Sequence, residues 1–176
     1  AIDLAVDLVR RFGDQFPRAF VDDWVAVAAD DAMHFALLDR RLRTLGSHYG
    51  AFPAHAGLWE AAQVTADDAL ARLAIVPMVL EARGLDVTPA TVERFRAAGD
   101  EASARILSRI YRDEIRHVRA GTDWFGWLCD ERGFNAVETW QSLVKSRFRR
   151  ILKPPFNDSA RHDAGLTQEY YALVAS

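Results

Sequence analysis

The sequence predicts an all-α protein, a four-helix bundle with one long crossover connection and additional C-terminal helices. Alanine, leucine and arginine, which favour helix, are frequent among its 176 residues, and alternating strand-like runs are nearly absent. Two apolar patterns of helical period each extend over about 30 residues, or roughly 45 Å of helix. Between them lies a long segment rich in glycine and proline, 46-GSHYGAFPAHAGLW-59. Long helices with one long connection are typical of a bundle with a crossover.

The first two helices are expected on either side of a short turn. Apolar residues at helical spacing predict a first helix over 2–12 that ends near Gly13. The chain starts at Ala1 inside this amphipathic pattern and without an initiator methionine, so we expect this helix to begin further upstream. A second helix is predicted from about 17 to 45, because Gly46 then stops it.

A third helix is predicted from Thr65 to Arg83. Thr65 is expected to cap its start, with acidic residues in the first turn, and Gly84 is expected to end it. Pro77 lacks a backbone N–H and is therefore expected to kink this helix. Residues 88–99 then form a short helix between two breaks.

The fourth helix is predicted over 100–132, where Gly133 follows it. Asn135 is expected to open a fifth helix. The tail after Pro155 is expected to hold one or two short helices, the last of them capped by Thr167. Because 176 residues suffice for one substantial core, we expect a single domain over 1–176.

A carboxylate and an imidazole face the interior of the fourth predicted helix. In 111-YRDEIRHVRAG-121, Glu114 and His117 are three residues apart and therefore share a helix face. In steps of three and four, the same face carries Ser103, Leu107, Ile110, Gly121, Trp124 and Leu128. Glutamate and histidine are seldom buried without a partner, so this pair needs a physical explanation.

The second predicted helix repeats this arrangement. In 29-ADDAMHF-35, Asp31 and His34 interrupt an apolar face made of Phe20, Trp24, Val27, Leu38, Leu42 and Leu45. The two stretches DDAMH and DEIRH share the form Asp-(Asp/Glu)-x-x-His. Glu81 adds a further acid to the core face of the third predicted helix, which also carries Leu70, Ala74 and Pro77.

A shared metal site explains these inward charges. A buried carboxylate without a counter-charge is strongly destabilising, and a divalent cation supplies that charge. Carboxylate with imidazole suits iron, manganese or zinc, and two such helix turns together provide four ligands. The alternatives are a buried ion pair or polar cluster at Glu114 and His117, and an ion pair between Glu81 and Arg83 or another arginine.

Five stretches resemble, over nearly the whole chain, a bacterial family of ferritin-like proteins of unknown function: AIDLAVD, DDAMHFALL, YGAFPAHAGLW, LARLAIVPMVLEARGLDVTP and IYRDEIRHV. The resemblance implies a ferritin-like four-helix bundle with a di-iron-type site. It also implies a distant kinship with the di-iron tRNA hydroxylase that acts on isopentenylated adenosine. The metal ligands that it implies are His34, Glu81, Glu114 and His117, with Asp31 where the family has glutamate.

The same resemblance leaves one ligand position unfilled. The family's first-helix glutamate would fall before Ala1, and neither Asp3 nor Asp7 lies at its place. The chain therefore carries five of the six protein ligands that such a site uses. This set suits two metal ions bound weakly, one metal ion, or none.

The composition argues against a nucleic-acid-binding, a disulfide-linked and a membrane-spanning protein. The net charge of −3 gives no electrostatic reason to expect nucleic acid as the main partner. The basic run 145-KSRFRRILK-153 is better explained as a solvated helix face than as an RNA contact. A single cysteine, Cys129, excludes an internal disulfide and suits a cytoplasmic protein. No apolar run approaches the roughly 20 residues that cross a bilayer, and no signal peptide is visible.

Two functions suit such a site. The first is a di-iron oxidoreductase, with manganese or zinc as alternative metals, that uses dioxygen to oxidise a small molecule or a modified nucleoside. The second is a non-catalytic helical binding module with a degenerate or structural metal site. In that case Arg83, Arg112 or Arg116 is expected to turn inward and neutralise the acids.

Overall fold

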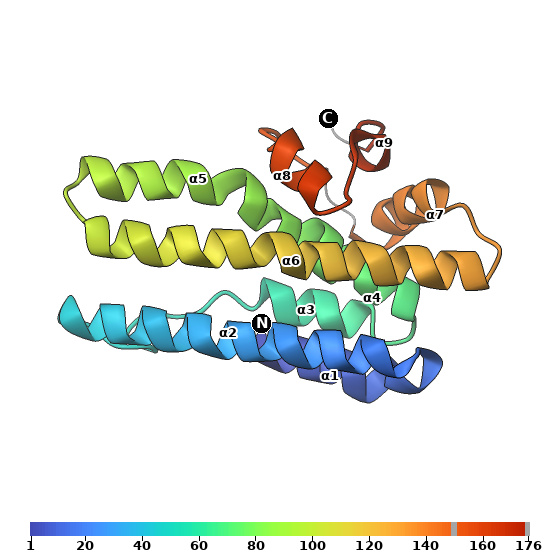
Figure 1. Cartoon of the computed structure of the whole chain (residues 1–176), viewed down its shortest axis with the longest axis horizontal. Coiled ribbons are helices and arrows are strands. Elements are labelled where there is room, and N and C mark those ends of the chain that lie inside the picture. The colour runs from blue at the N-terminus through green and yellow to red at the C-terminus, as the bar shows by residue number, and fades with distance from the viewer. Residues whose placement is uncertain (149–150, 175–176) are drawn as a thin grey trace.

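Two pairs of antiparallel helices form the body of the protein (Figure 1). The computed structural model describes residues 1–148 and 151–174, and every regular element in these ranges is helical. Helix α1 (Ile2–Phe12) packs along α2 (Arg18–Thr44), and α5 (Ala82–Ala97) packs along α6 (Glu101–Glu131). Helices α2 and α6 contact each other and run in opposite directions, so they join the two pairs. The prediction of an all-α protein is confirmed for the described part of the chain.

The shorter elements complete the fold around these pairs. They are η1 (Gly13–Gln15), α3 (Gly57–Val64), α4 (Ala69–Ile75), η2 (Val76–Glu81), α7 (Ala136–Leu143), η3 (Val144–Phe148), α8 (Asp158–Asp163) and α9 (Gln168–Tyr171). Helices α7, α8 and α9 gather on one side of the α5–α6 pair (Figure 1). Within the described ranges, no helix combines the length and the apolar character that crossing a membrane requires.

Several helix ends lie where the sequence predicts them, because local capping decides them. The Asp100 side chain accepts a hydrogen bond from the backbone N–H of Ser103 and opens α6. The Asn135 side chain accepts one from the N–H of Glu138 and opens α7. Gly133, after the end of α6, has a φ of 68°, the left-handed conformation that glycine adopts easily.

The predicted third helix is wrong in both of its bounds. Thr65 follows the end of α3, and its hydroxyl donates to the carbonyl of Ala61 instead of capping the next helix. Asp68 is the true cap of α4, because its side chain accepts a hydrogen bond from the N–H of Leu70. Gly84 does not end the helix, because α5 continues through it. Most of the short helix predicted over 88–99 is therefore the second half of α5.

The predicted disturbance at Pro77 takes the form of a π-helical turn. Element η2 extends over Val76–Glu81 between α4 and α5, with Pro77 in its first turn. Proline has no N–H to donate, so the regular α-helical ladder is interrupted there. Helix α6 approaches this turn closely, since a Cβ added to Gly121 would lie 2.5 Å from the Cβ of Pro77.

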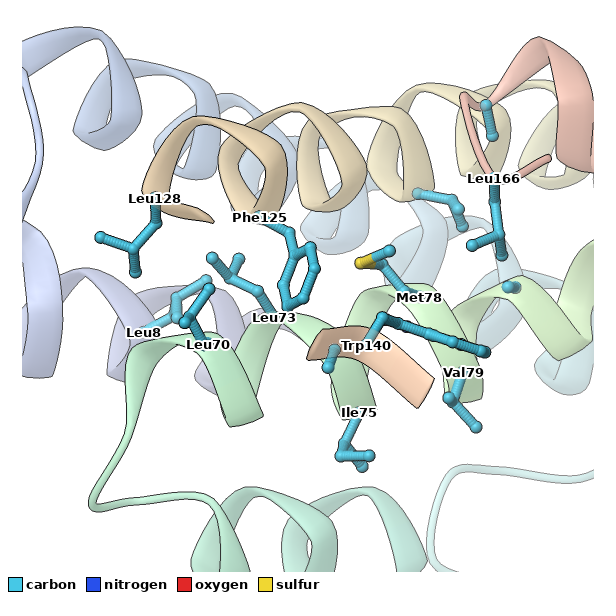
Figure 2. Packing of buried hydrophobic residues seen from close by; sticks show 14 of the residues in the cluster. Leu8, Leu70, Leu73, Ile75, Met78, Val79, Phe125, Leu128, Trp140 and Leu166 are labelled. Carbon is cyan, nitrogen blue, oxygen red and sulfur yellow. The ribbon is translucent and has the colours of Figure 1, made fainter. Parts of the chain in front are cut away.

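One main apolar core lies between α4, η2, α6 and the first half of α2. Met78 of η2 and Phe125 of α6 are both fully buried and face each other (Figure 2). On α2 the predicted apolar face is buried from Phe20 to His34, but Leu38 and Leu45 are 40% and 57% exposed. The C-terminal end of α2 therefore extends beyond the core, contrary to the prediction.

Candidate metal centre

Three of the predicted ligands converge at the contact between α2 and α6. One donor atom each from Asp31, Glu114 and His117 lies within 4.8 Å of the other two. Nδ1 of His117 is 3.5 Å from Oε2 of Glu114 and 4.0 Å from Oδ1 of Asp31. Two donors on one ion, each about 2.1 Å from it, are separated by at most about 4.2 Å. Both separations at His117 meet this condition.

The fourth predicted ligand, His34, occupies the matching place on α2. Its Nδ1 lies 3.5 Å from Oδ1 of Asp31, the acid one turn earlier on the same helix. The ring centroids of His34 and His117 are 5.7 Å apart. Both histidines are buried, so the two acid–histidine pairs form one interior cluster, although His34 lies outside the tightest group of three.

Each histidine is also held by an aspartate of the opposite helix. Nε2 of His34 is 3.1 Å from Oδ2 of Asp113, and Nε2 of His117 is 3.3 Å from Oδ2 of Asp30. A carboxylate at Nε2 favours the tautomer that carries the proton there, which leaves the Nδ1 lone pair free for a metal ion. The contacts with Asp30 and Asp113 therefore orient both imidazoles toward the same space.

These two aspartates are not among the residues predicted from the sequence. Asp30 and Asp113 are the first residues of the two Asp-(Asp/Glu)-x-x-His stretches, so the signal was present in the shared motif. Asp113 also accepts hydrogen bonds from Arg109 and Arg116, at 2.7 and 2.9 Å. These two bonds, and the one from His34, outweigh the effect of burial and hold the pKa of Asp113 well below its usual range.

The fifth predicted ligand, Glu81, ends the π-helical turn η2. Its Oε2 atom is buried and has no hydrogen-bond partner among the described residues. Arg83, its expected partner in the alternative interpretation, instead contacts Asp86 and the backbone carbonyls of Lys153 and Pro155. Burial raises the pKa of Glu81 to about 8, and the Glu114 and Asp31 carboxylates act in the same direction.

The electrostatics of the cluster are those of an incompletely neutralised acidic site. Burial raises the pKa of Asp31, against the effect of His117. Burial lowers the pKa of His117, but contact with Glu114 and the nearby charges of Asp31 and Glu81 raise it to about 9. In the absence of a metal ion, protons on these groups therefore neutralise part of the negative charge.

The donor set fits a divalent metal ion. No arginine or lysine in the described ranges bonds to Asp31, Glu81 or Glu114. Arg116, expected to turn inward if the site had lost its metal, instead bonds to Asp30 and Asp113. The partnerless buried oxygen of Glu81, near the carboxylates of Asp31 and Glu114 and the imidazole of His117, matches the ligand preferences of iron, manganese and zinc.

A cleft lies beside the cluster, and Ala1, Ile2 and Asp3 at the start of α1 belong to its lining. Asp31, His34 and Glu114 belong to its lining, together with apolar side chains that include Phe35 and Tyr49. The Phe35 and Tyr49 rings meet edge to face, with centroids 5.2 Å apart. The cleft therefore joins polar donors at its inner end to an aromatic wall near the surface.

Comparison with known proteins places the chain in a family. It is 45% identical over 174 residues to an uncharacterized protein of Haemophilus influenzae, an alignment that covers 96% of this chain. The chain spans 60% of the length of that relative. No solved structure matches. A family model described as a protein of unknown function, DUF455, matches residues 1–172, and the chain therefore belongs to the DUF455 family.

Proposed function

We propose that residues 1–176 form a single ferritin-like domain that binds two metal ions, preferentially iron, and uses them with dioxygen to oxidise an organic substrate. The antiparallel pairs α1–α2 and α5–α6, with acids and histidines between α2 and α6, support this bundle type. The proposed ligands are Asp31, His34, Glu81, Glu114 and His117. We expect the sixth ligand to come from residues upstream of Ala1.

One observation carries the proposal. The interior holds the carboxylates of Asp31, Glu81 and Glu114, and none of them bonds to a lysine or arginine of the described residues. Neighbouring arginines are present, but they bond to Asp30, Asp86 and Asp113 instead. Metal ions at the centre would supply positive charge that otherwise comes only from protons on groups such as His117 and Glu81.

The side chains have separate roles at the proposed metal centre. Iron bound here would supply the electrons that reduce dioxygen. The carboxylates of Asp31, Glu81 and Glu114 provide anionic oxygen donors, and Nδ1 of each histidine provides a neutral nitrogen donor. Asp30 and Asp113 hold the proton on each Nε2 and thereby fix the imidazole orientation.

The cleft beside the cluster is the proposed substrate entrance. The rings of Phe35 and Tyr49, which are 45% and 65% exposed, offer apolar and stacking contacts there. A small molecule or modified nucleoside is therefore the proposed substrate class.

A non-catalytic helical module with a single structural ion is the second candidate. Asp31, Glu114 and His117 form the close group, whereas His34 and Glu81 lie outside it. Asp31 is also one methylene shorter than glutamate. The chain's own α1 acid Asp7 does not complete the site, because it bonds to Arg10, Arg11 and Arg72.

Metal analysis of the protein purified from iron-replete cells tests the proposal. We expect iron in the parent chain, rising to about two ions per chain when the upstream residues are included. The His117→Ala variant is expected to lose iron and to unfold at a lower temperature than the loaded parent. His162→Ala serves as the matched control, because His162 is an exposed residue of α8.

The outcomes separate the two candidates. Two ions per chain, with oxygen consumption by the ferrous protein, support the oxidoreductase. One ion that withstands chelators and no oxygen consumption support the structural module. A His117→Ala variant that binds iron as the parent does excludes both.

A further inference from the structure

A second hollow region lies away from the metal centre, along η2 and the start of α5. Two adjoining cavities of about 390 and 600 Å³ share Leu80, Arg83 and Phe148 in their linings. The first extends along α3, and the second extends along the C-terminal segment as far as α8. We call the two together the η2 groove. Their volumes lie in the range of about 300 to 1,000 Å³ that is typical of small-molecule sites.

The wall of the η2 groove is mainly apolar. Ile75 belongs to the lining of the first cavity, and its side chain points away from Phe125 (Figure 2). Val79, Ile151 and Phe156 line the second cavity. A hydrocarbon chain placed here removes apolar surface from water on both partners, which favours binding.

The accessible charge at the middle of the groove is positive. Arg83 lines both cavities, its side chain is 41% exposed, and its Nη1 donates to the carbonyls of Lys153 and Pro155. Lys153 is exposed and lines the second cavity beside it. The carboxylate of Asp86 also belongs to this lining, but its side chain is completely covered.

Arg161 supplies a second, buried cation. Its Nε and Nη2 donate to the two carboxylate oxygens of Asp86 at 2.8 Å each, and its Cζ lies 4.9 and 4.6 Å from the ring centroids of Phe156 and Tyr171. The side chain is 3% exposed, and its buried Nη1 has no partner among the described residues. Arg161 lines the second cavity, but its guanidinium is bonded to Asp86 and covered, so the cations that a ligand can reach there are Arg83 and Lys153.

We propose that the η2 groove binds a fatty acid, with the carboxylate at Arg83 and Lys153 and the alkyl chain over Leu80 and Phe148. A guanidinium held at one end by Nη1 can still present its Nε and Nη2 edge to a carboxylate. The apolar wall disfavours a nucleic-acid backbone, which requires a polar cationic surface. This inference explains part of the basic run 145–153, of which Arg149 and Arg150 lie outside the described residues.

Calorimetric titration with dodecanoate, below its micellar concentration, tests the inference. The parent protein is expected to bind dodecanoate at least about tenfold more tightly than dodecanol, because only the acid bonds to the cations. Arg83→Gln and Lys153→Gln are each expected to remove most of this preference, while Arg83→Lys retains it. Arg94→Gln is the matched control, because Arg94 is an exposed arginine of the same helix.

Several outcomes overturn the inference. These are equal binding of dodecanol and dodecanoate, an unchanged preference in both Arg83→Gln and Lys153→Gln, and displacement of the acid by single-stranded RNA. Tighter binding of dodecyl phosphate than of dodecanoate would show that the groove prefers a phosphate to a carboxylate, and this result also overturns the inference. All titrations contain a metal chelator, so the result does not depend on the proposed metal centre.

Discussion

His34 of α2 and Asp113 of α6 contact each other across the two long helices, with 3.1 Å between Nε2 and Oδ2. His117 makes the reciprocal contact with Asp30, at 3.3 Å. In both helices the histidine Nδ1 lies 3.5 Å from the acid one turn earlier. The two contacts therefore fix the register of α2 against α6 and aim both imidazoles at one centre.

Replacing Asp113 by asparagine is expected to weaken metal binding by about 10- to 100-fold. The amide has no negative charge to hold the proton on Nε2 of His34 or to bond to Arg109 and Arg116. Competition with a chromogenic chelator measures the affinity. Asp39→Asn is the control, because Asp39 bonds to Arg43 on the surface of α2. Equal losses in the two variants would contradict the orienting role of Asp113.

Metal affinity is expected to rise steeply with pH. An incoming ion must displace protons from Glu81, whose pKa burial raises to about 8, and from His117, whose pKa is about 9 because its acidic neighbours outweigh burial. Both groups are protonated below about pH 8, so the affinity should change by about 100-fold per pH unit there. The dependence should weaken to about tenfold between these pKa values and vanish above them. Chelator competition from about pH 6 to pH 10 measures this profile, and a flat profile would contradict it.

Gly121→Ala is expected to destabilise the protein by about 1–3 kcal/mol. The new Cβ would lie 2.5 and 2.6 Å from two ring atoms of Pro77, which forces α6 and η2 apart. Gly126→Ala on the same helix meets nothing within 4 Å and should stabilise the protein by up to about 1 kcal/mol. Urea unfolding measures both variants. The Gly121→Ala variant should also bind metal more weakly, since Glu81 lies one turn after Pro77. Equal stabilities of the two variants would contradict the close contact between Gly121 and Pro77.

Asp7→Asn is expected to lower the free energy of unfolding by about 2 kcal/mol at neutral pH. Burial raises the pKa of Asp7, but hydrogen bonds from Arg10, Arg72 and Arg11 outweigh it and lower the pKa to about 2. A lowered pKa stabilises the folded state above the unfolded value of 3.8, and this stabilisation is lost as the pH falls through about 2.

Urea unfolding of parent and Asp7→Asn between about pH 2 and pH 7 measures this difference, which should disappear at the acidic end. Asp22→Asn is the control, because Asp22 and Arg18 form an exposed pair on α2. The free energy of unfolding of Asp22→Asn should stay within about 1 kcal/mol of the parent value at every pH. A difference between parent and Asp7→Asn that does not change with pH would exclude the proposed ion pair as its cause.

Local chemistry made several helix ends predictable, whereas distant contacts decided the others. Asp100 and Asn135 bond to residues only three positions away, so their caps can be predicted directly. Gly84 suggested a helix end, but the helix continues into Asp86, which bonds to Arg161. Helix α3 was missed, because its eight residues bury Ala62 alone and show too little pattern.

The sequence indicated that Asp31, Glu114 and His117 come together, but it did not indicate what surrounds them. Two acid–histidine pairs on apolar helix faces indicated Asp31, His34, Glu114 and His117. The roles of Asp30 and Asp113 depend on the register between α2 and α6, which no spacing within one helix contains. The isolation of the Glu81 carboxylate likewise depends on where Arg83 finds its partners.

The π-helical turn η2 sets the rotation of α4 relative to α5. One residue advances an α-helix by about 100°. If the same residues formed a regular α-helix instead of the wider π-helical turn, the two flanking segments would rotate against each other by about that angle. Either Glu81 would leave the cluster, or Leu70 and Leu73 of α4 would leave the core. The wide turn therefore keeps Glu81 and the apolar side chains of α4 on their respective sides of the helix.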